Sequence, residues 1–328
     1  MADVSLGPPD RDRLFGGDGA READRAQLLL VAGLVMAVSL VTLVVLLNAT
    51  IYSENVATRG IESADGEALE VRATAVGGAG ELIGATNRAE PANHSEANER
   101  VESGVEDLDA EISRSYAERG GVTHLNLSSV ENGSRVTGEL GAVDPNASLL
   151  AGNVTRTRGF VIDVDPDSLN ETDPAGAVDD AFHVDLNDST GGSRQVYVYD
   201  GTDGNVTVAV GENGSAPTAL CETPPDGRSR VAVDLTGERL GDRPCPGIWP
   251  RGLVAPDDDD YTVTLVNASS AGGEVTATAR PASGDSVSTD LAATATAAVY
   301  EATIELRYRT AELRFETAVR VAPGEPDA

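Results

Sequence analysis

The amino-acid sequence predicts an α+β protein with a long N-terminal transmembrane helix, a second amphipathic helix and a predominantly antiparallel β domain. Three observations predict this fold class: an uninterrupted apolar segment near the N-terminus, a stretch with helical spacing of apolar residues, and a later change to alternating apolar and polar residues. The expected domains are a disordered tail, the transmembrane helix, a helical stem and a β-rich domain, with the ranges 1–25, 26–48, 49–121 and 122–328.

The apolar segment runs from Ala26 to Leu47 and contains 22 residues without a charge. As an α-helix it would be about 33 Å long, close to the thickness of a bilayer's hydrocarbon core. A cleaved secretory signal would have a shorter apolar region that ends at small residues, whereas Leu47 stands where a small residue is needed. Because Arg21 and Arg25 precede the segment, the positive-inside rule predicts a cytoplasmic tail, an extracellular C-terminal part and a single pass through the lipid bilayer.

Two helical stretches are expected in the stem. The first continues from Tyr52 to about Val76 and is expected to end at Gly77 and Gly78. The second carries apolar residues at spacings of three and four and is followed by a glycine pair, Gly120–Gly121. Its stripe consists of Ala97, Val101, Val105, Leu108, Ile112 and Tyr116.

From residue 122 onward the apolar pattern has the period of two that is typical of strands, and clusters of Gly, Asp, Asn and Pro separate the alternating runs. This arrangement favours an antiparallel sheet or sandwich. The predicted strands are His124–Val130, Gly159–Val164, Phe182–Leu186, Gln195–Tyr199, Val206–Val210, Arg230–Leu235, Tyr261–Val266, Glu274–Ala279, Val299–Tyr308 and Leu313–Val321.

The chain has 54 acidic residues, 24 basic residues that are all arginine, and a net charge of −30. This composition resembles that of proteins from extreme halophiles, in which concentrated salt screens the repulsion between carboxylates. It argues against nucleic acid as a partner, because binding to phosphates requires clustered basic residues.

Eleven of the 14 asparagines open an Asn-x-Ser/Thr triplet, whereas chance would supply roughly two. Asparagine and serine both favour turns, but that preference does not explain a hydroxyl at the second following position so often. The density predicts N-glycosylation outside the cell. Asn48 lies at the expected membrane edge; the candidate acceptors are Asn93, Asn126, Asn132, Asn146, Asn153, Asn170, Asn187, Asn205, Asn213 and Asn267.

Cys221 and Cys245 are the only cysteines, and both fall in the predicted extracellular part. An oxidising location favours a disulfide between them, which would contribute about 3 kcal/mol by closing the intervening loop. The competing interpretation is a pair of buried free thiols.

The N-terminus carries a resemblance to a known type of signal. Arg25-Ala26-Gln27-Leu28, followed directly by the apolar segment, resembles the class III signal that archaeal prepilin peptidases cleave. The resemblance implies cleavage after Ala26, so that Gln27 becomes the mature N-terminus. Residues 24–60, including Ile51-Tyr52-Ser53-Glu54-Asn55, are similar to a family of pilin-like secreted glycoproteins of halophilic archaea. In such proteins the apolar helices pack together in a filament, which implies other pilin-like subunits as partners.

No motif indicates an enzyme, a cofactor site or a metal site. The three histidines, His94, His124 and His183, lack metal-ligand spacing. Asp257–Asp260 is expected to be a solvated turn rather than a cation site.

Three functional hypotheses follow from the sequence. The first is a membrane-anchored, N-glycosylated structural protein that is pilin-like or associated with the cell envelope. The second is a signal-anchored surface module that binds a ligand, a polysaccharide or a partner protein. The third is an extracellular hydrolase without a recognisable motif.

Overall fold

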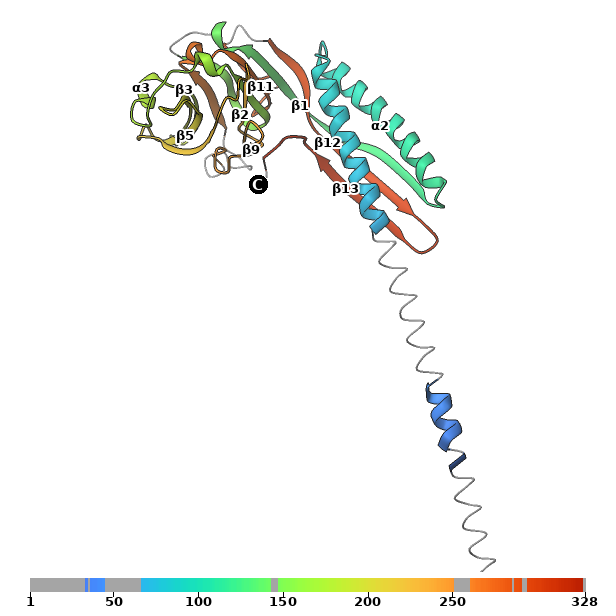
Figure 1. The fold of residues 1–328 in the computed structure, drawn as a ribbon. Helices are drawn as coiled ribbons and strands as arrows, with labels where there is room; N and C mark the ends of the chain where they lie inside the picture. Colours follow the sequence, from blue (N-terminus) through green and yellow to red (C-terminus); the bar gives the residue numbers. More distant parts are fainter. Residues whose placement is uncertain are drawn as a thin grey trace, which may run out of the picture. The chain divides into compact units, whose positions relative to one another are not determined.

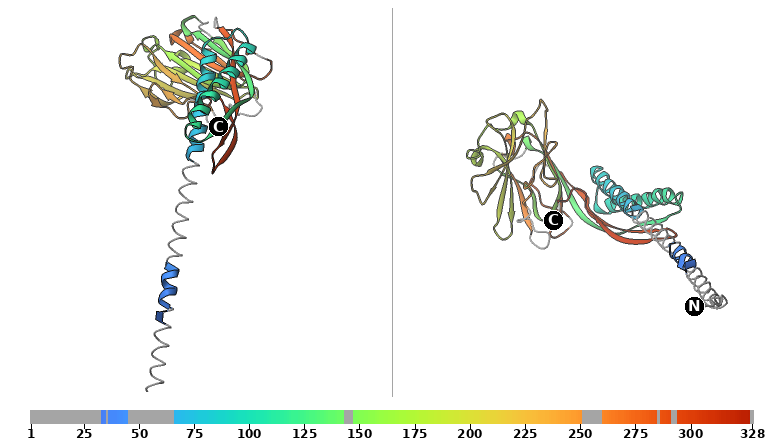
Figure 2. Two further views of the ribbon diagram at one scale, coloured as in Figure 1. Left: turned by 90° about the vertical axis from the view of Figure 1, so that its right-hand side faces the viewer. Right: turned by 60° about the horizontal axis from the view of Figure 1, so that its bottom comes forward.

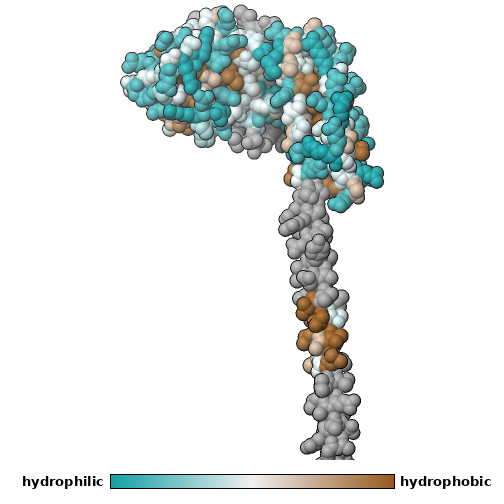
Figure 3. All heavy atoms as spheres, turned by 45° about the vertical axis from the view of Figure 1, so that its right-hand side comes forward, coloured by the Kyte–Doolittle hydropathy of each residue, from teal (hydrophilic) through white to brown (hydrophobic). Residues whose placement is uncertain are grey.

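The computed structural model describes residues 33–34, 36–44, 66–142, 147–250, 260–284, 286–290 and 294–326. The chain divides into two compact units, residues 1–66 and 67–328. In the first unit, residues 33–34 and 36–44 are helical, and their large apolar side chains are exposed, with Met36 72% accessible. Figure 3 shows this apolar surface in brown.

The predicted α+β class with a long N-terminal transmembrane helix is wrong. The described part of the chain is mostly antiparallel β-sheet. None of its helices combines the length and the apolar composition needed to cross a membrane. Residues 26–32, 35 and 45–48 of the predicted helix lie outside the described residues. The strands also extend well beyond the alternating runs from which they were predicted: β1 covers Val122–Glu139 and β2 covers Ala147–Val164.

Two helices joined by a short turn precede the strands: residues 66–88, all but the first of which belong to the second unit, and α2, His94–Ala117 (Figure 1). Asn93 caps α2, since its side chain accepts a hydrogen bond from the backbone N–H of Glu96. The predicted stripe of this helix is confirmed: Ala97, Val101, Val105, Ile112 and Tyr116 are buried, and Leu108 is partly buried.

The expected helix end at Gly77 and Gly78 is wrong, because the first helix continues to residue 88. A Cβ on Gly78 would lie 2.9 Å from Cδ1 of Leu108 on α2. In the same way, a Cβ on Gly104 of α2 would overlap the side chain of Leu82 on the first helix. Each helix thus offers a glycine that receives a leucine of the other helix, so that these glycines allow close approach instead of ending the helix.

In the described part of the chain, thirteen strands form one sheet whose main order is β13-β12-β1-β11-β2-β10-β3-β4-β5-β6, and all their pairings are antiparallel. The strands are β1 Val122–Glu139, β2 Ala147–Val164, β3 Phe182–Asp188, β4 Ser193–Asp200, β5 Val206–Glu212, β6 Thr218–Thr223, β7 Val231–Asp234, β8 Arg239–Leu240, β9 Arg243–Pro244, β10 Tyr261–Val266, β11 Gly273–Pro281, β12 Thr294–Arg309 and β13 Arg314–Val321. The short helix α3, Ala177–Asp180, precedes β3.

Part of the sheet closes on itself. Strand β2 pairs with β10, which continues through β3, β4 and β5 to β6, and β2 also pairs with β7, which continues through β8 to β9. Cys221 in β6 and Cys245, directly after β9, form a disulfide between the two ends of this path. The strands curl around a common interior, as the views in Figures 1 and 2 show. We call this part the closed ring.

The second unit contains two large hydrophobic cores. One fills the closed ring and includes Phe160, Phe182, Trp249 and Tyr261. The other, which we call the helix-covered region, lies between the two helices and strands β1, β12 and β13, and includes Val71 and Ile304. Strand β1 belongs to both, because Leu125 is part of the helix-covered core and Val136 part of the ring core. This long strand joins the two regions.

Candidate functional site

The described sequon asparagines all reach the surface. Asn93, Asn126, Asn153, Asn170 and Asn213 are exposed, and Asn132, Asn187, Asn205 and Asn267 are partly exposed. Asn146 lies outside the described residues. Glycosylation requires an accessible asparagine, so this distribution is compatible with the predicted modification at each of the nine positions.

Turn formation accounts for part of the asparagine pattern. Asn153, Asn213 and Asn267 adopt left-handed backbone conformations, with φ values of 57°, 52° and 54°. Asparagine tolerates this region better than most residues, which explains its presence at these three positions. Asn126 and Asn187 lie within strands and have no such conformational role.

The two cysteines are joined across the closed ring, with their Cα atoms 5.7 Å apart. Cys245 is fully buried in the ring core, while Cys221 is partly buried against it. The disulfide therefore connects the outermost strand of the main sheet, β6, to the short strands that branch from β2.

The predicted processing site and acidic turn cannot be placed. Arg25, Ala26 and Gln27 lie outside the described residues, as do 257–259 of the aspartate run. Asp260 is described, and its carbonyl oxygen accepts a hydrogen bond from the backbone N–H of Ser189 at 3.1 Å.

The three histidines have different surroundings and do not contact a common group. His94 Nε2 lies 2.8 Å from the carbonyl oxygen of Gly133, and His124 Nδ1 lies 3.3 Å from Asp109. His183 is buried against the ring of Tyr197, and burial lowers its pKa. Within the described ranges, no three His, Cys, Asp or Glu side chains gather as metal ligands would.

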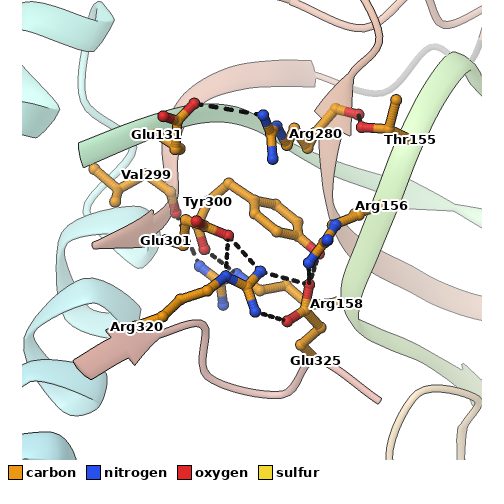
Figure 4. Close-up of polar contacts among 10 residues, drawn as sticks. All are labelled: Glu131, Thr155, Arg156, Arg158, Arg280, Val299, Tyr300, Glu301, Arg320 and Glu325. Atoms are coloured by element: carbon orange, nitrogen blue, oxygen red, sulfur yellow. Dashed lines mark hydrogen bonds and ion pairs between the residues drawn. The ribbon is translucent and has the colours of Figure 1, made fainter. Parts of the chain in front are cut away.

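A buried arginine forms the most extensive polar contact between distant segments (Figure 4). Arg158 of β2 is 4% exposed, and its guanidinium donates to the carbonyls of Tyr300 at 2.7 Å and Val299 at 2.9 Å. It also donates to the carbonyl of Pro323 at 2.6 Å. Burial lowers the pKa of Arg158 to about 10, so the group remains charged at neutral pH. Three carbonyl acceptors compensate in part for the loss of hydration.

The same junction holds the helices. Asn87, in the last turn of the first helix, donates through Nδ2 to the carbonyl of Val299 and accepts through Oδ1 from its N–H, both at 2.9 Å. Val299 therefore receives hydrogen bonds from both Asn87 and Arg158. Val299 of β12 is thus hydrogen-bonded both to the first helix and to β2.

Glu325 ties the C-terminal segment to this junction. It accepts a hydrogen bond from the Tyr300 hydroxyl at 2.8 Å and forms ion pairs with Arg156 and Arg320 (Figure 4). Burial alone would raise the pKa of Glu325, but donation from Arg320 and Tyr300 outweighs it and lowers the pKa. Burial and the nearby carboxylate raise the pKa of Tyr300, so its hydroxyl stays protonated and donates.

We call Arg158, Asn87, Tyr300, Arg320 and Glu325 the arginine junction. Its side chains make hydrogen bonds and ion pairs with other groups of this chain. The junction therefore stabilises the contact between β2, β12, the first helix and the C-terminal segment. Sequence reasoning missed it. The one available indication was a charged residue, Arg158, directly before the predicted strand Gly159–Val164.

A shallow groove of about 680 Å³ lies beside the junction, between the first helix and the end of β13. Its lining includes Gly77, Gly80, Gly84 and Arg88. Gly80 is 3.7 Å from Pro323, measured from the position a Cβ would take. The groove is also lined by the charged side chains of Glu81, Arg158 and Arg320.

Comparison with known proteins identifies one family, described as a family of unknown function (DUF7261), which matches residues 22–192. The chain belongs to this family. The DUF7261 match covers just over half of the chain, from the apolar segment through the helices to β3. No curated protein and no solved structure matches the chain.

The DUF7261 match includes only some of the strands of the sheet. Strands β1, β2 and β3 lie within it, whereas their partners β10, β11 and β12 follow residue 192. Arg158 and Asn87 also fall inside the match, while their acceptor Val299 lies outside. The matched part therefore depends on the C-terminal strands to complete its sheet.

Proposed function

We propose that this protein is a structural subunit of the cell surface, held at the membrane by its apolar N-terminal segment, glycosylated, and pilin-like in its processing. The observation that carries the proposal is the set of sequons: eleven occur in the sequence, and the nine that the structure describes all reach the surface.

Two further features support the proposal. Segment 26–47 carries no charge and is as apolar as segments that partition into lipid. The dense acidic surface, with a disulfide closing the ring, suits a protein that works in an oxidising and salt-rich exterior.

The decisive experiment determines the native N-terminus and the sidedness of the protein. Mass spectrometry of the protein purified from its own membranes is expected to find a mature chain that starts at Gln27. The variant Ala26→Leu is expected to retain Met1 or Ala2 at its start, while Arg21→Ser, outside the motif, is processed normally.

Protease added to intact cells is expected to release fragments of residues 67–328. An unprocessed N-terminus together with protease release would contradict the pilin-like part and favour the signal-anchored binding module. Complete protection from protease would contradict a surface location altogether.

A further inference from the structure

We infer that the folded protein accepts N-linked glycan at four of the nine described sequons, Asn93, Asn126, Asn187 and Asn213, with Asn126 the best acceptor. The inference rests on the proposed surface location. It goes further by stating which positions are modified, and it follows from the hydrogen bonds and burial at each sequon.

The chemistry sets two requirements. Transfer from a lipid-linked oligosaccharide phosphate forms a bond between the asparagine Nδ2 and C1 of the sugar, breaks the C1–O bond to the phosphate leaving group and releases one amide proton to solvent. The amide nitrogen must therefore be free to enter a transferase. The Ser or Thr hydroxyl must be reachable too, because the acceptor motif includes it.

The first requirement excludes sequons whose amide nitrogen is held by the protein. Asn267 Nδ2 donates to the carbonyls of Asp179 and Ala181, both at 3.2 Å. Asn170 Nδ2 donates to the carbonyl of Asp180 at 2.7 Å. Modification at either position would break contacts that fix a turn.

Two more sequons have an engaged amide. Asn205 Nδ2 donates to the carboxylate of Asp203 at 2.6 Å. Asn153 Nδ2 donates to Ser283 Oγ at 3.4 Å.

The second requirement excludes Asn132, although its amide nitrogen donates no hydrogen bond to the described residues. The hydroxyl of its sequon belongs to Ser134, which is 1% exposed and accepts a hydrogen bond from the N–H of Val287 at 3.2 Å. Asn205 fails this requirement as well, since Thr207 is 6% exposed. A transferase cannot reach either hydroxyl in the folded chain.

Asn126 meets both requirements. Leu125 points into the helix-covered core, so the next residue, Asn126, points to the opposite, open face of β1. Its side chain has no hydrogen-bond partner among the described residues, and Ser128 is exposed. The pairing of β1 with β12 shifts between Leu127 and Ser129, so that Ser128 lies at a β-bulge and is absent from the ladder.

The other three acceptors combine a free amide nitrogen with an exposed hydroxyl. Asn93 uses Oδ1 to cap α2, and Asn213 uses Oδ1 to accept from the N–H of Ser193 at 3.2 Å. Both interactions leave Nδ2 directed elsewhere. Asn187 has no side-chain partner among the described residues. The hydroxyls of these three sequons belong to Ser95, Ser215 and Ser189, which are all exposed. Two of them also make hydrogen bonds at the surface: Ser95 Oγ donates to Glu99 at 3.1 Å, and Ser215 Oγ donates to the carbonyl of Glu212 at 2.6 Å.

Site-resolved glycopeptide mass spectrometry of the full chain from its own cells tests the inference. Glycan is expected on Asn126, Asn93, Asn187 and Asn213, and unmodified peptide at Asn132, Asn153, Asn170, Asn205 and Asn267. The matched variants S128A and S269A each remove one exposed sequon hydroxyl. S128A is expected to lower the mass of the intact protein by one glycan, whereas S269A leaves the glycan mass unchanged.

Glycan on Asn267 or Asn132, or an unmodified Asn126, would overturn the inference. These results leave the surface location standing, because that is measured separately by protease release from intact cells. A chain that is protease-accessible but free of sugar would contradict the glycan assignment and the glycosylation stated in the proposed function, but would leave the surface location standing. A chain that is both protected and sugar-free would contradict the proposed function as well.

Discussion

The helix-covered region and the closed ring reach a stable core by different means. The helix face that meets the sheet carries small and aliphatic residues, such as Ala75, Ala79 and Ile83, and its glycines let the two helices approach closely. The ring is filled by larger side chains, including Phe160 and Trp249, and a disulfide joins its ends.

The difference shows how a chain with only 4% aromatic residues can support two cores. Close approach of backbones compensates for small side chains in one region, since dispersion depends on short distances. In the other, Phe160, Phe182, Trp249 and Tyr261 fill the interior, and the disulfide limits the conformational freedom of the unfolded chain. The arginine junction and strand β1 connect the two regions.

The largest expected effect comes from breaking that connection. Arg158→Met removes the donor to three buried carbonyls and is expected to lower the free energy of unfolding by about 3–5 kcal/mol. Denaturant unfolding in concentrated salt measures the change. Arg307→Met, at an exposed arginine paired with Glu305 at 3.8 Å, is the control and should change stability by less than about 0.5 kcal/mol. If both variants lowered the free energy of unfolding equally, the buried hydrogen bonds of Arg158 would stabilise the fold no more than an exposed ion pair does.

Opening the ring is expected to have the next largest effect. The double variant Cys221→Ala/Cys245→Ala removes a link between residues 24 apart and should cost about 3 kcal/mol. Hydrogen exchange should show the loss of protection in β6 to β9 and little change in α2. Uniform loss of protection across both regions would show that the ring and the helices unfold as one unit.

The glycines of the helix pair should respond with opposite signs. Gly104→Ala places a methyl group against Leu82 and is expected to destabilise by about 1–3 kcal/mol, because the leucine must move. Gly77→Ala meets nothing within 4 Å and should stabilise by up to about 1 kcal/mol through helix propensity. Melting temperatures of the two variants provide the measurement. Stabilisation by both would mean that close helix contact contributes little.

The smallest effect concerns Glu325 and pH. Its folded pKa is lowered from 4.5, so the stability it contributes is present above about pH 4.5 and is lost as pH falls through the folded pKa. Thermal unfolding of the protein and of Glu325→Gln at several pH values should show a difference that is largest near pH 7 and shrinks in acid. A difference in stability that does not change with pH would mean that Glu325 acts through its packing and not through its charge.

The sequence by itself determined the elements whose burial follows a local period. The apolar stripe of α2 predicted its buried residues, and the alternation in Tyr261–Val266 predicted β10 with its bounds. The two cysteines suggested a disulfide without any knowledge of the fold. In each case the decisive information lies within a few neighbouring residues.

The tertiary structure alone decided the rest. Strand β1 extends to Glu139 because bulges interrupt its alternation while its pairing with β12 continues. Strand β6 was missed because most of its side chains are exposed and leave no alternating pattern. The partners of Arg158 lie 141 to 165 residues further along the chain, and the burial of Ser134 depends on a similarly distant segment. Contacts between such distant residues leave no periodic trace in the sequence, so only the folded chain shows which sequons are accessible and what joins the two cores.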